Sequence, residues 1–152
     1  MTEARILSAL VEGVSELGDV LRGAAEVIAQ REGQTLARWQ LLSAVSSEKK
    51  TVSDLAREFG HRRQSVQRIT DVLVRDQLVV YRDNPNHERS PLVGLTAQGK
   101  RLLGRLIKRQ REFHRVLSRK TTKPKLAALR RGVDELREIV TGIDWKKARP
   151  KK

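Results

Sequence analysis

The side chains best suited to a specific chemistry lie close together, between residues 62 and 68. An arginine can donate two hydrogen bonds to a guanine edge, a glutamine can pair with adenine, and a serine can donate or accept. We predict that six side chains in this stretch contact DNA in the major groove: Arg62, Arg63, Gln64, Ser65, Gln67 and Arg68. The same residue types also occur on solvated helix faces, so the elements around them decide between the two interpretations.

Those elements have helix-turn-helix spacing. Thr51 or Ser53 can cap a short helix that ends at Gly60, and a second helix is predicted over residues 62–75 with Val66 among its inward positions. In such a motif the first turns of the second helix meet base edges, while neighbouring residues hold phosphates. Residues 62–68 occupy those turns.

A β-hairpin is predicted directly after the second helix. Residues 78–82 and 92–95 read as strands, and residues 83–91 form a polar connection between them. A cation in such a wing can enter a minor groove or meet a phosphate. The wing candidates are Arg82, His87 and Arg89. A flexible loop with incidental charge is the alternative, and His87 shows no partner in the sequence.

Long amphipathic helices flank these elements. Apolar residues recur at steps of three and four over residues 3–31 and again after Pro124, where they follow a heptad seam. Such stripes exceed what one small core needs, so we predict burial against a second copy; the alternative is a compact monomer. The predicted dimerisation residues are Leu7, Leu10, Val14, Leu17, Leu126, Leu129, Val133, Leu136 and Val140.

The charge of the chain favours a polyanionic partner. The 152 residues carry a formal net charge of +14. Residues 100–123 contribute +9 and residues 146–152 contribute +5, so the rest of the chain sums to zero. The excess charge therefore lies outside the predicted reading helix. It indicates either a solvated helix face or a second surface for DNA.

Other classes of function find little support. The chain has no cysteine, and its three histidines lie far apart, so we expect no metal, no cofactor and no thiol redox switch. No carboxylate pair, nucleophile with a base, or phosphate loop indicates an enzyme. No apolar run approaches the roughly 18–20 residues that span a bilayer, and the N-terminus lacks the pattern of a signal peptide. We expect a cytoplasmic protein.

The order of these parts resembles the MarR (multiple antibiotic resistance regulator) family of dimeric winged-helix repressors. The resemblance rests on residues 51–56, 65–73 and 77–82, and most specifically on Leu95-Thr96-Ala97-Gln98-Gly99 at the exit from the wing. It implies a dimer built from the terminal helices, wing arginines near the minor groove, and regulation by a small molecule or an oxidant. Two features depart from the family: Glu88 replaces a wing cation, and the cysteines of the redox sensors are absent.

We therefore predict a mainly α fold with a small β-wing, a winged helix-turn-helix with N- and C-terminal dimerisation helices. Residues 34–99 would form the DNA-binding domain, residues 1–33 and 118–145 the dimerisation helices, residues 100–117 a connecting helix and residues 146–152 a basic tail. Trp39 would line an effector pocket or belong to the core.

The predicted function is a sequence-specific regulator, a repressor that binds a pseudo-palindromic site in double-stranded DNA as a homodimer and is released by a small-molecule effector. Two alternatives remain: an architectural protein that binds duplexes with low specificity, and a protein-docking module.

Overall fold

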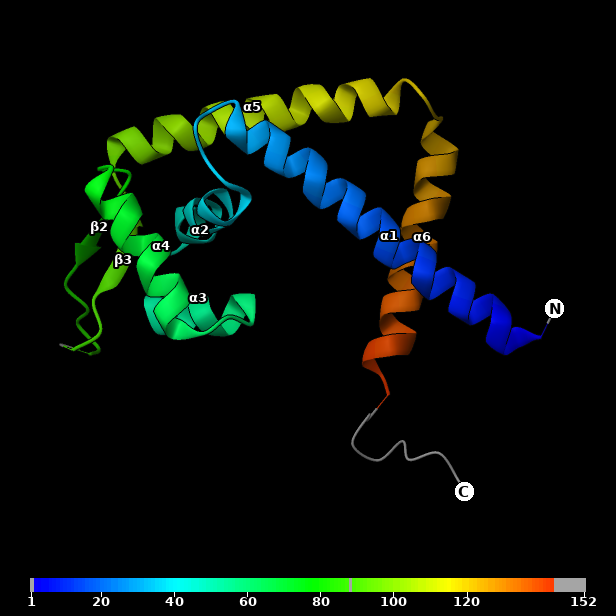
Figure 1. Ribbon diagram of the computed structural model, residues 1–152, viewed down its shortest axis with the longest axis horizontal. Helices are drawn as coiled ribbons and strands as arrows, with labels where there is room; N and C mark the ends of the chain where they lie inside the picture. The colour runs from blue at the N-terminus through cyan, green and yellow to red at the C-terminus, as the bar shows by residue number, and fades with distance from the viewer. Residues whose placement is uncertain (1, 88, 144–152) are drawn as a thin grey trace. The chain divides into compact units, whose positions relative to one another are not determined.

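The computed structural model describes residues 2–87 and 89–143, and Figure 1 shows the path of the chain. The expectations about Glu88 and the basic tail lie outside these residues. The described chain forms two compact units, which divide between Gln110 and Arg111. In order, the elements are α1 (Glu3–Gln30), α2 (Leu36–Ser47), β1 (Lys50–Thr51), α3 (Val52–Phe59), α4 (Arg63–Arg75), β2 (Val79–Arg82), β3 (Leu92–Leu95), α5 (Ala97–Ser118) and α6 (Lys123–Thr141).

The core of the first unit lies where α2, α3 and α4 pack with the small sheet and the start of α5. Aliphatic side chains fill it almost entirely, because the chain has few aromatic residues. The largest fully buried side chains are Leu41, Leu42, Leu55, Leu73 and Leu106. This mainly helical architecture with a small sheet confirms the predicted winged helix-turn-helix fold.

The sheet has three antiparallel strands in the order β1-β3-β2. Val79 pairs with Leu95 and Arg82 with Leu92, which gives the predicted hairpin. Strand β1 was not predicted, because two residues of an edge strand have no periodicity that a sequence pattern can show. It joins the segment after α2 to the wing through the pair Lys50 and Val93.

Threonine side chains cap the starts of α2, α3 and α5, and Thr51 is the cap that the sequence predicts for α3. The Thr35 hydroxyl oxygen accepts from the Arg38 amide at 3.3 Å, and Thr51 caps α3. The hydroxyl oxygen of Thr96 accepts from the Gly99 amide at 3.0 Å. At the other end of α3, Gly60 adopts the left-handed conformation with φ +63°, which ends the helix.

At the exit from the wing, α5 approaches the end of the hairpin closely. A Cβ atom at Gly99 would lie 2.0 Å from the carbonyl oxygen of Leu78, so only glycine fits there. The Thr96 hydroxyl also donates to the Gln77 carbonyl at 2.7 Å. These contacts explain the residue types at this junction. Thr96 holds the end of the hairpin, and Gly99, three residues later, lets α5 approach it.

Helices α1 and α6 leave their apolar stripes exposed, each within its own unit. Leu7, Leu10, Val14 and Leu17 are 42–54% exposed, and α6 contains no buried residue. On α6, Leu126, Leu129, Val133 and Val140 are 40–57% exposed, and Leu136 is half-buried. No helix in the described part of the chain is long and apolar enough to cross a membrane.

Candidate nucleic-acid interface

Helix α4 carries the predicted reading residues, and its inner face is firmly packed. Val66, Thr70 and Leu73 are buried, and the Thr70 hydroxyl donates to the Val66 carbonyl at 2.9 Å, which satisfies the one polar group on that face. The opposite face is therefore the one that points outward. Arg62 is the residue before the first turn of α4, so the predicted set begins where the helix begins.

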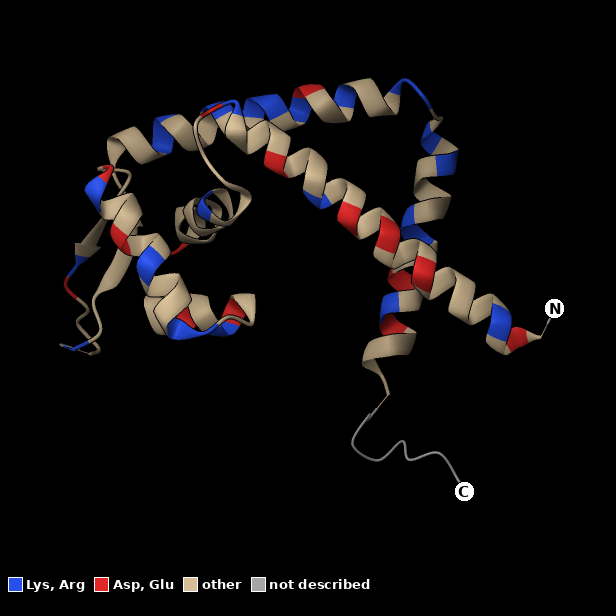
Figure 2. Ribbon diagram, viewed as in Figure 1, with Lys and Arg blue, Asp and Glu red and all other residues tan. Residues whose placement is uncertain are grey.

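Five of the six predicted side chains lie on that outer surface: Arg62, Arg63, Gln64, Ser65 and Arg68 are exposed. None of the three arginines forms an ion pair with an acid among the residues that the structure describes. Their guanidinium groups are therefore available to a phosphate or a base edge. Figure 2 marks the lysine and arginine positions of α3, α4 and α5 in blue.

Gln67 differs from the other five because its amide group is already bonded. Its Nε2 donates to the Tyr81 hydroxyl oxygen at 2.6 Å and to Oδ1 of Asp71 at 2.8 Å. The Tyr81 hydroxyl donates in turn to the same Asp71 oxygen at 3.1 Å. Burial raises the pKa of the Tyr81 phenol, so the hydroxyl keeps the proton that it donates. The resulting triangle joins α4 to β2.

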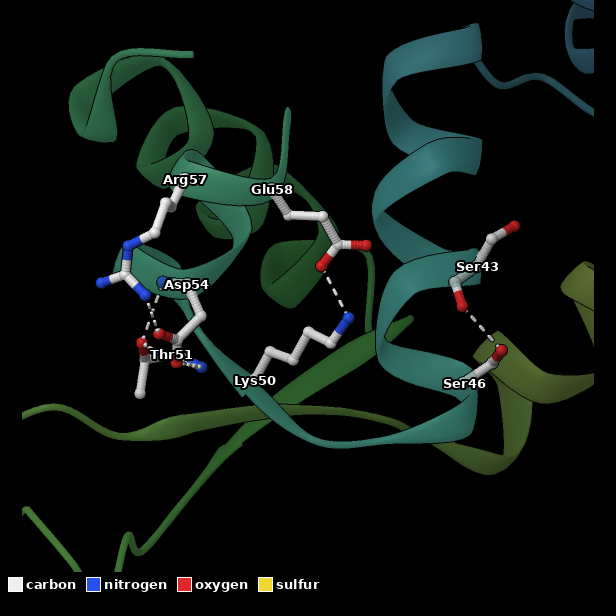
Figure 3. A network of polar contacts seen from close by, with 7 residues as sticks. All are labelled: Ser43, Ser46, Lys50, Thr51, Asp54, Arg57 and Glu58. Carbon is white, nitrogen blue, oxygen red and sulfur yellow. Dashed lines mark hydrogen bonds and ion pairs between the residues drawn. The ribbon is translucent and has the colours of Figure 1, made fainter. Parts of the chain in front are cut away.

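Helix α3 is held by a reciprocal cap (Figure 3). The Asp54 amide donates to the Thr51 hydroxyl oxygen at 3.1 Å, and the Thr51 amide donates back to Oδ2 of Asp54 at 3.3 Å. The hydroxyl of Thr51 lies 2.6 Å from that oxygen, and Arg57 pairs with the other one at 3.3 Å. Bonds from the side chain and the backbone of Thr51 hold the pKa of Asp54 below its usual range.

A second ion pair fixes the far end of α4. The Arg38 guanidinium on α2 pairs with Asp76, the residue that closes α4. The Arg38 side chain is only 18% exposed, so solvent screens this pair less than a surface pair. Together with the triangle at Gln67, this pair orients α4 at two points along its length.

The tip of the wing is closed by Asn84. Its side-chain nitrogen donates to the Ser90 carbonyl at 2.8 Å, and its side-chain oxygen accepts from the Asn86 amide at 3.1 Å. An amide side chain therefore braces the tip of the wing. His87 and Arg89, the two candidates from the loop between the strands, are both exposed.

Arg82 lies away from the other candidates. Neighbouring residues of a strand point to opposite faces, so Arg82 lies on the face opposite Tyr81, which bonds to α4. Its Nε is 3.5 Å from the position that a Cβ of Gly94 would take. The structure thus groups Arg63 with Gln67 on one side of the wing and leaves Arg82 on the other.

A small notch separates the reading helix from the wing. It has a volume of about 120 Å³, and α3, α4 and the hairpin each contribute to its wall. Among its lining residues are Ser53, Arg63, Gln67, Tyr81 and Ser90. Polar side chains from three elements thus converge on one opening.

A larger cavity of about 720 Å³ lies within the first unit, next to the helix-turn-helix. Trp39 and Phe59 form apolar parts of its wall, and α5 contributes Leu103 and Ile107. Trp39 is 6% exposed, so it belongs to the core and also lines the cavity.

One ion pair stands in the wall of this cavity. Lys50 Nζ lies 2.6 Å from Oε2 of Glu58, as Figure 3 shows, and this hydrogen bond raises the pKa of Lys50. Lys50 directly precedes Thr51, the cap of α3, and Glu58 belongs to α3 itself. The cavity wall and the helix-turn-helix therefore share these residues.

The basic segment of α5 is partly neutralised inside the protein. Arg105 and Arg109 both pair with Glu32 through their Nε atoms, at 2.7 and 2.5 Å. Hydrogen bonds from these two arginines hold the pKa of Glu32 below its usual value, and its side chain is 9% exposed. Two cations of this segment thus hold the end of α1 to α5.

In the described part of the chain, no group of three or more potential ligands could hold a metal ion.

Sequence reasoning missed the residues that position the reading helix. Tyr81 lies 10 positions from Asp71 and 14 from Gln67, and Arg38 lies 38 positions from Asp76, so no local pattern indicates these contacts. The bond between Gln67 and Asp71 spans one helical turn, a spacing that a sequence pattern can show. The capping box of Thr51 and Asp54 was detectable, because a threonine followed three residues later by an acid is a known start signal.

Comparisons with known proteins agree with this geometry. Residues 32–90 match the model of the MarR family. An uncharacterized protein of Mycobacterium tuberculosis is 41% identical over 137 residues, which cover 90% of this chain and 94% of that protein. A solved MarR family transcription regulator has a TM-score of 0.85 at 24% identity, over 96% of this chain and 97% of that one. Staphylococcus aureus MarR, in complex with salicylate and kanamycin, has a TM-score of 0.80 at 11% identity, over 91% and 94%.

Proposed function

The chain belongs to the MarR family of winged-helix transcription regulators, and from this we propose that it is a repressor that binds a pseudo-palindromic DNA site as a homodimer. One observation carries the proposal: Arg62 before α4 and Arg63 and Arg68 in its first two turns are exposed and bond to no described acid, while the other face of α4 is fixed in the core. Arg62, Arg63, Gln64 and Arg68 would form the main major-groove set, with Ser65 and Gln67 assisting.

The wing supports the same surface. His87 and Arg89 are exposed beside the bond from Asn84 to Ser90, and this exposure supports a contact with a minor groove. Arg82 points to the other face of the hairpin, where it would meet a flanking phosphate.

The second copy is proposed from the exposed stripes of α1 and α6. Aliphatic side chains at steps of three and four stay 42–57% exposed at Leu10, Val14, Leu129 and Val133. A stripe of this length on a free chain would cost free energy in water, and a symmetric partner covers it.

Selection of bound duplexes from random DNA tests the proposal. We expect a two-fold symmetric site with half-sites about one helical turn apart. A complex of two chains per duplex should form, and deletion of the site from a reporter promoter should raise expression. An enriched site without two-fold symmetry, or a reporter that loses expression, would contradict the dimeric repressor.

The cavity beside the helix-turn-helix supports release by a small molecule. Trp39, Phe59 and Leu103 could contact an apolar body, and the pair Lys50–Glu58 could meet a polar group. An effector acts only through a difference in affinity between the DNA-binding conformation and another one. Since a relative of this fold was solved with salicylate, salicylate is the first probe.

We expect salicylate to lower the affinity for the selected duplex. Ser43→Trp, which places a large side chain at the cavity wall, should abolish that response and leave DNA binding intact. An equal salicylate response in both proteins would exclude this cavity.

The basic segment of α5 favours a second candidate, an architectural protein with low specificity. Lys100, Arg101 and Lys108 are exposed and have no ion pair with a described acid, although Arg105 and Arg109 are engaged by Glu32. Steep salt dependence with equal affinity for all duplexes would favour this candidate over the repressor.

A further inference from the structure

The triangle of Gln67, Asp71 and Tyr81 limits the hydrogen bonds that Gln67 can form with a base. A glutamine amide has two N–H donors and one carbonyl acceptor. Both partners of Gln67 Nε2, the Tyr81 hydroxyl oxygen at 2.6 Å and Asp71 Oδ1 at 2.8 Å, are acceptors for these donors. Gln67 therefore has no donor left for DNA while the triangle is intact.

The chemistry of the partners fixes the orientation of this amide. An ionised carboxylate only accepts hydrogen bonds, so the amide nitrogen and not the carbonyl oxygen must face Asp71. The Tyr81 hydroxyl donates its own proton to Asp71 at 3.1 Å, so it can only accept from Gln67. Every donor in the triangle meets an acceptor, and turning the amide over would break two bonds.

The Gln67 side chain lies on the same face of α4 as Arg63, one of the predicted reading residues. Gln67 lies one helical turn after Arg63, so both share a face of α4, and both line the notch between the helix and the wing. Gln67 is half-buried, because the wing covers its nitrogen side.

We propose that Gln67 is a specificity-determining residue that reads DNA only as an acceptor, because Tyr81 and Asp71 hold its amide donors. This inference rests on the proposed sequence-specific binding. In the major groove, adenine and cytosine present amino donors, whereas guanine and thymine present oxygen acceptors. At one position of each half-site the protein accepts adenine or cytosine and rejects guanine and thymine. A free glutamine would instead select adenine alone, through a second bond to N7.

Selection from random duplexes with four proteins tests this reading. The wild type should show one position that tolerates adenine and cytosine equally. Gln67→Leu should lose the discrimination there, by about fivefold or more, because one hydrogen bond disappears. Tyr81→Phe frees one amide donor and should turn the same position toward adenine, by about fivefold over cytosine. Gln98→Leu, at an exposed glutamine of α5 that lies outside the proposed DNA-binding set, is the control and should leave that position unchanged.

Hydrogen exchange in the DNA-free protein provides a second arm. Tyr81→Phe should speed the exchange of the β2 and β3 amides, while Gln98→Leu should not. The proposal is overturned by strict selection of adenine at the position that depends on Gln67, by no change in any position with Gln67→Leu, or by unchanged exchange with Tyr81→Phe. Failure of the wild type to enrich any site would count against the proposed repressor instead, and hydrogen exchange would still test the triangle.

Discussion

Arg63 stands in the first turn of α4, exposed and without an ion pair among the described residues, on the face that lines the notch. We expect Arg63→Ala to weaken binding to the selected site by about 1–3 kcal/mol and to relax one base position. Titration of matched and mutated duplexes measures both effects. Arg75→Ala, which removes the same charge at the other end of α4, is the control. Equal losses in both variants would mean that Arg63 contributes charge and no base recognition.

Gly99 matters for packing, because its lack of a side chain lets α5 lie close to the hairpin. Gly99→Ala would place a Cβ atom against the Leu78 carbonyl oxygen, so α5 or the hairpin must shift. We expect a loss of about 1–3 kcal/mol in the free energy of unfolding. Denaturant unfolding measures it, and Gly104→Ala, on the same helix where the added Cβ meets nothing within 4 Å, should be neutral or stabilising. Similar unfolding curves for the two variants would contradict the close approach.

The sequence predicted which residues are candidates for DNA contact. It could not predict which of their side chains are already hydrogen-bonded within the protein. Arg62, Arg63, Gln64, Ser65 and Arg68 are exposed at the start of α4, where the turn after Gly60 and the inward Val66 require them to be. The engagement of Gln67 depends on Tyr81, fourteen residues away on a strand. Such a contact depends on the packing of the hairpin against α4, which no local pattern encodes.

At the scale of elements, α3 depends on its charged cap. The pKa of Asp54 is lowered by its bonds to Thr51, so its stabilising contribution is present above the unfolded pKa of about 3.9 and is lost as the pH falls through the lower folded value. We expect wild type to exceed Asp54→Asn in stability at pH 7, and the difference to shrink below about pH 4. Thermal unfolding across this range measures it. A difference that stays constant with pH would mean that the charge of Asp54 is not involved.

The helices and the hairpin were predictable because their signals are local. Thr35, Thr51 and Thr96 mark helix starts, Gly60 marks an end, and alternating strand residues surround a polar tip. Strand β1 was missed because two residues carry no period, and the link between α1 and α5 through Glu32 joins residues 73 and 77 positions apart.

At the scale of the whole molecule, assembly should control DNA binding. Val14 lies on the exposed stripe of α1, so Val14→Glu would place a charge in the proposed dimer interface. We expect the dimer to dissociate at micromolar concentration. The affinity for the two-fold symmetric site should fall at least tenfold, because a dimer binds two linked half-sites and a monomer binds only one. Sedimentation and a binding titration measure these effects.

The control for this variant lies on the opposite face of the same helix. Glu12→Gln changes a charge there and should leave the dimer and the DNA affinity intact. A Val14→Glu protein that stays dimeric and binds as wild type does would show that the α1 stripe is not the interface.

The triangle on α4 also has a consequence for retargeting the protein to a new operator. A designer who replaced Gln67 alone would alter the base preference and loosen the hairpin in the same step, since one amide joins both. Gln64 and Arg68 form no hydrogen bond to the wing in the described structure. Substitutions there can change the base preference without loosening the hairpin. Natural divergence meets the same constraint: a change at Gln67 would need a compensating change at Tyr81, so these two positions should vary together across the family.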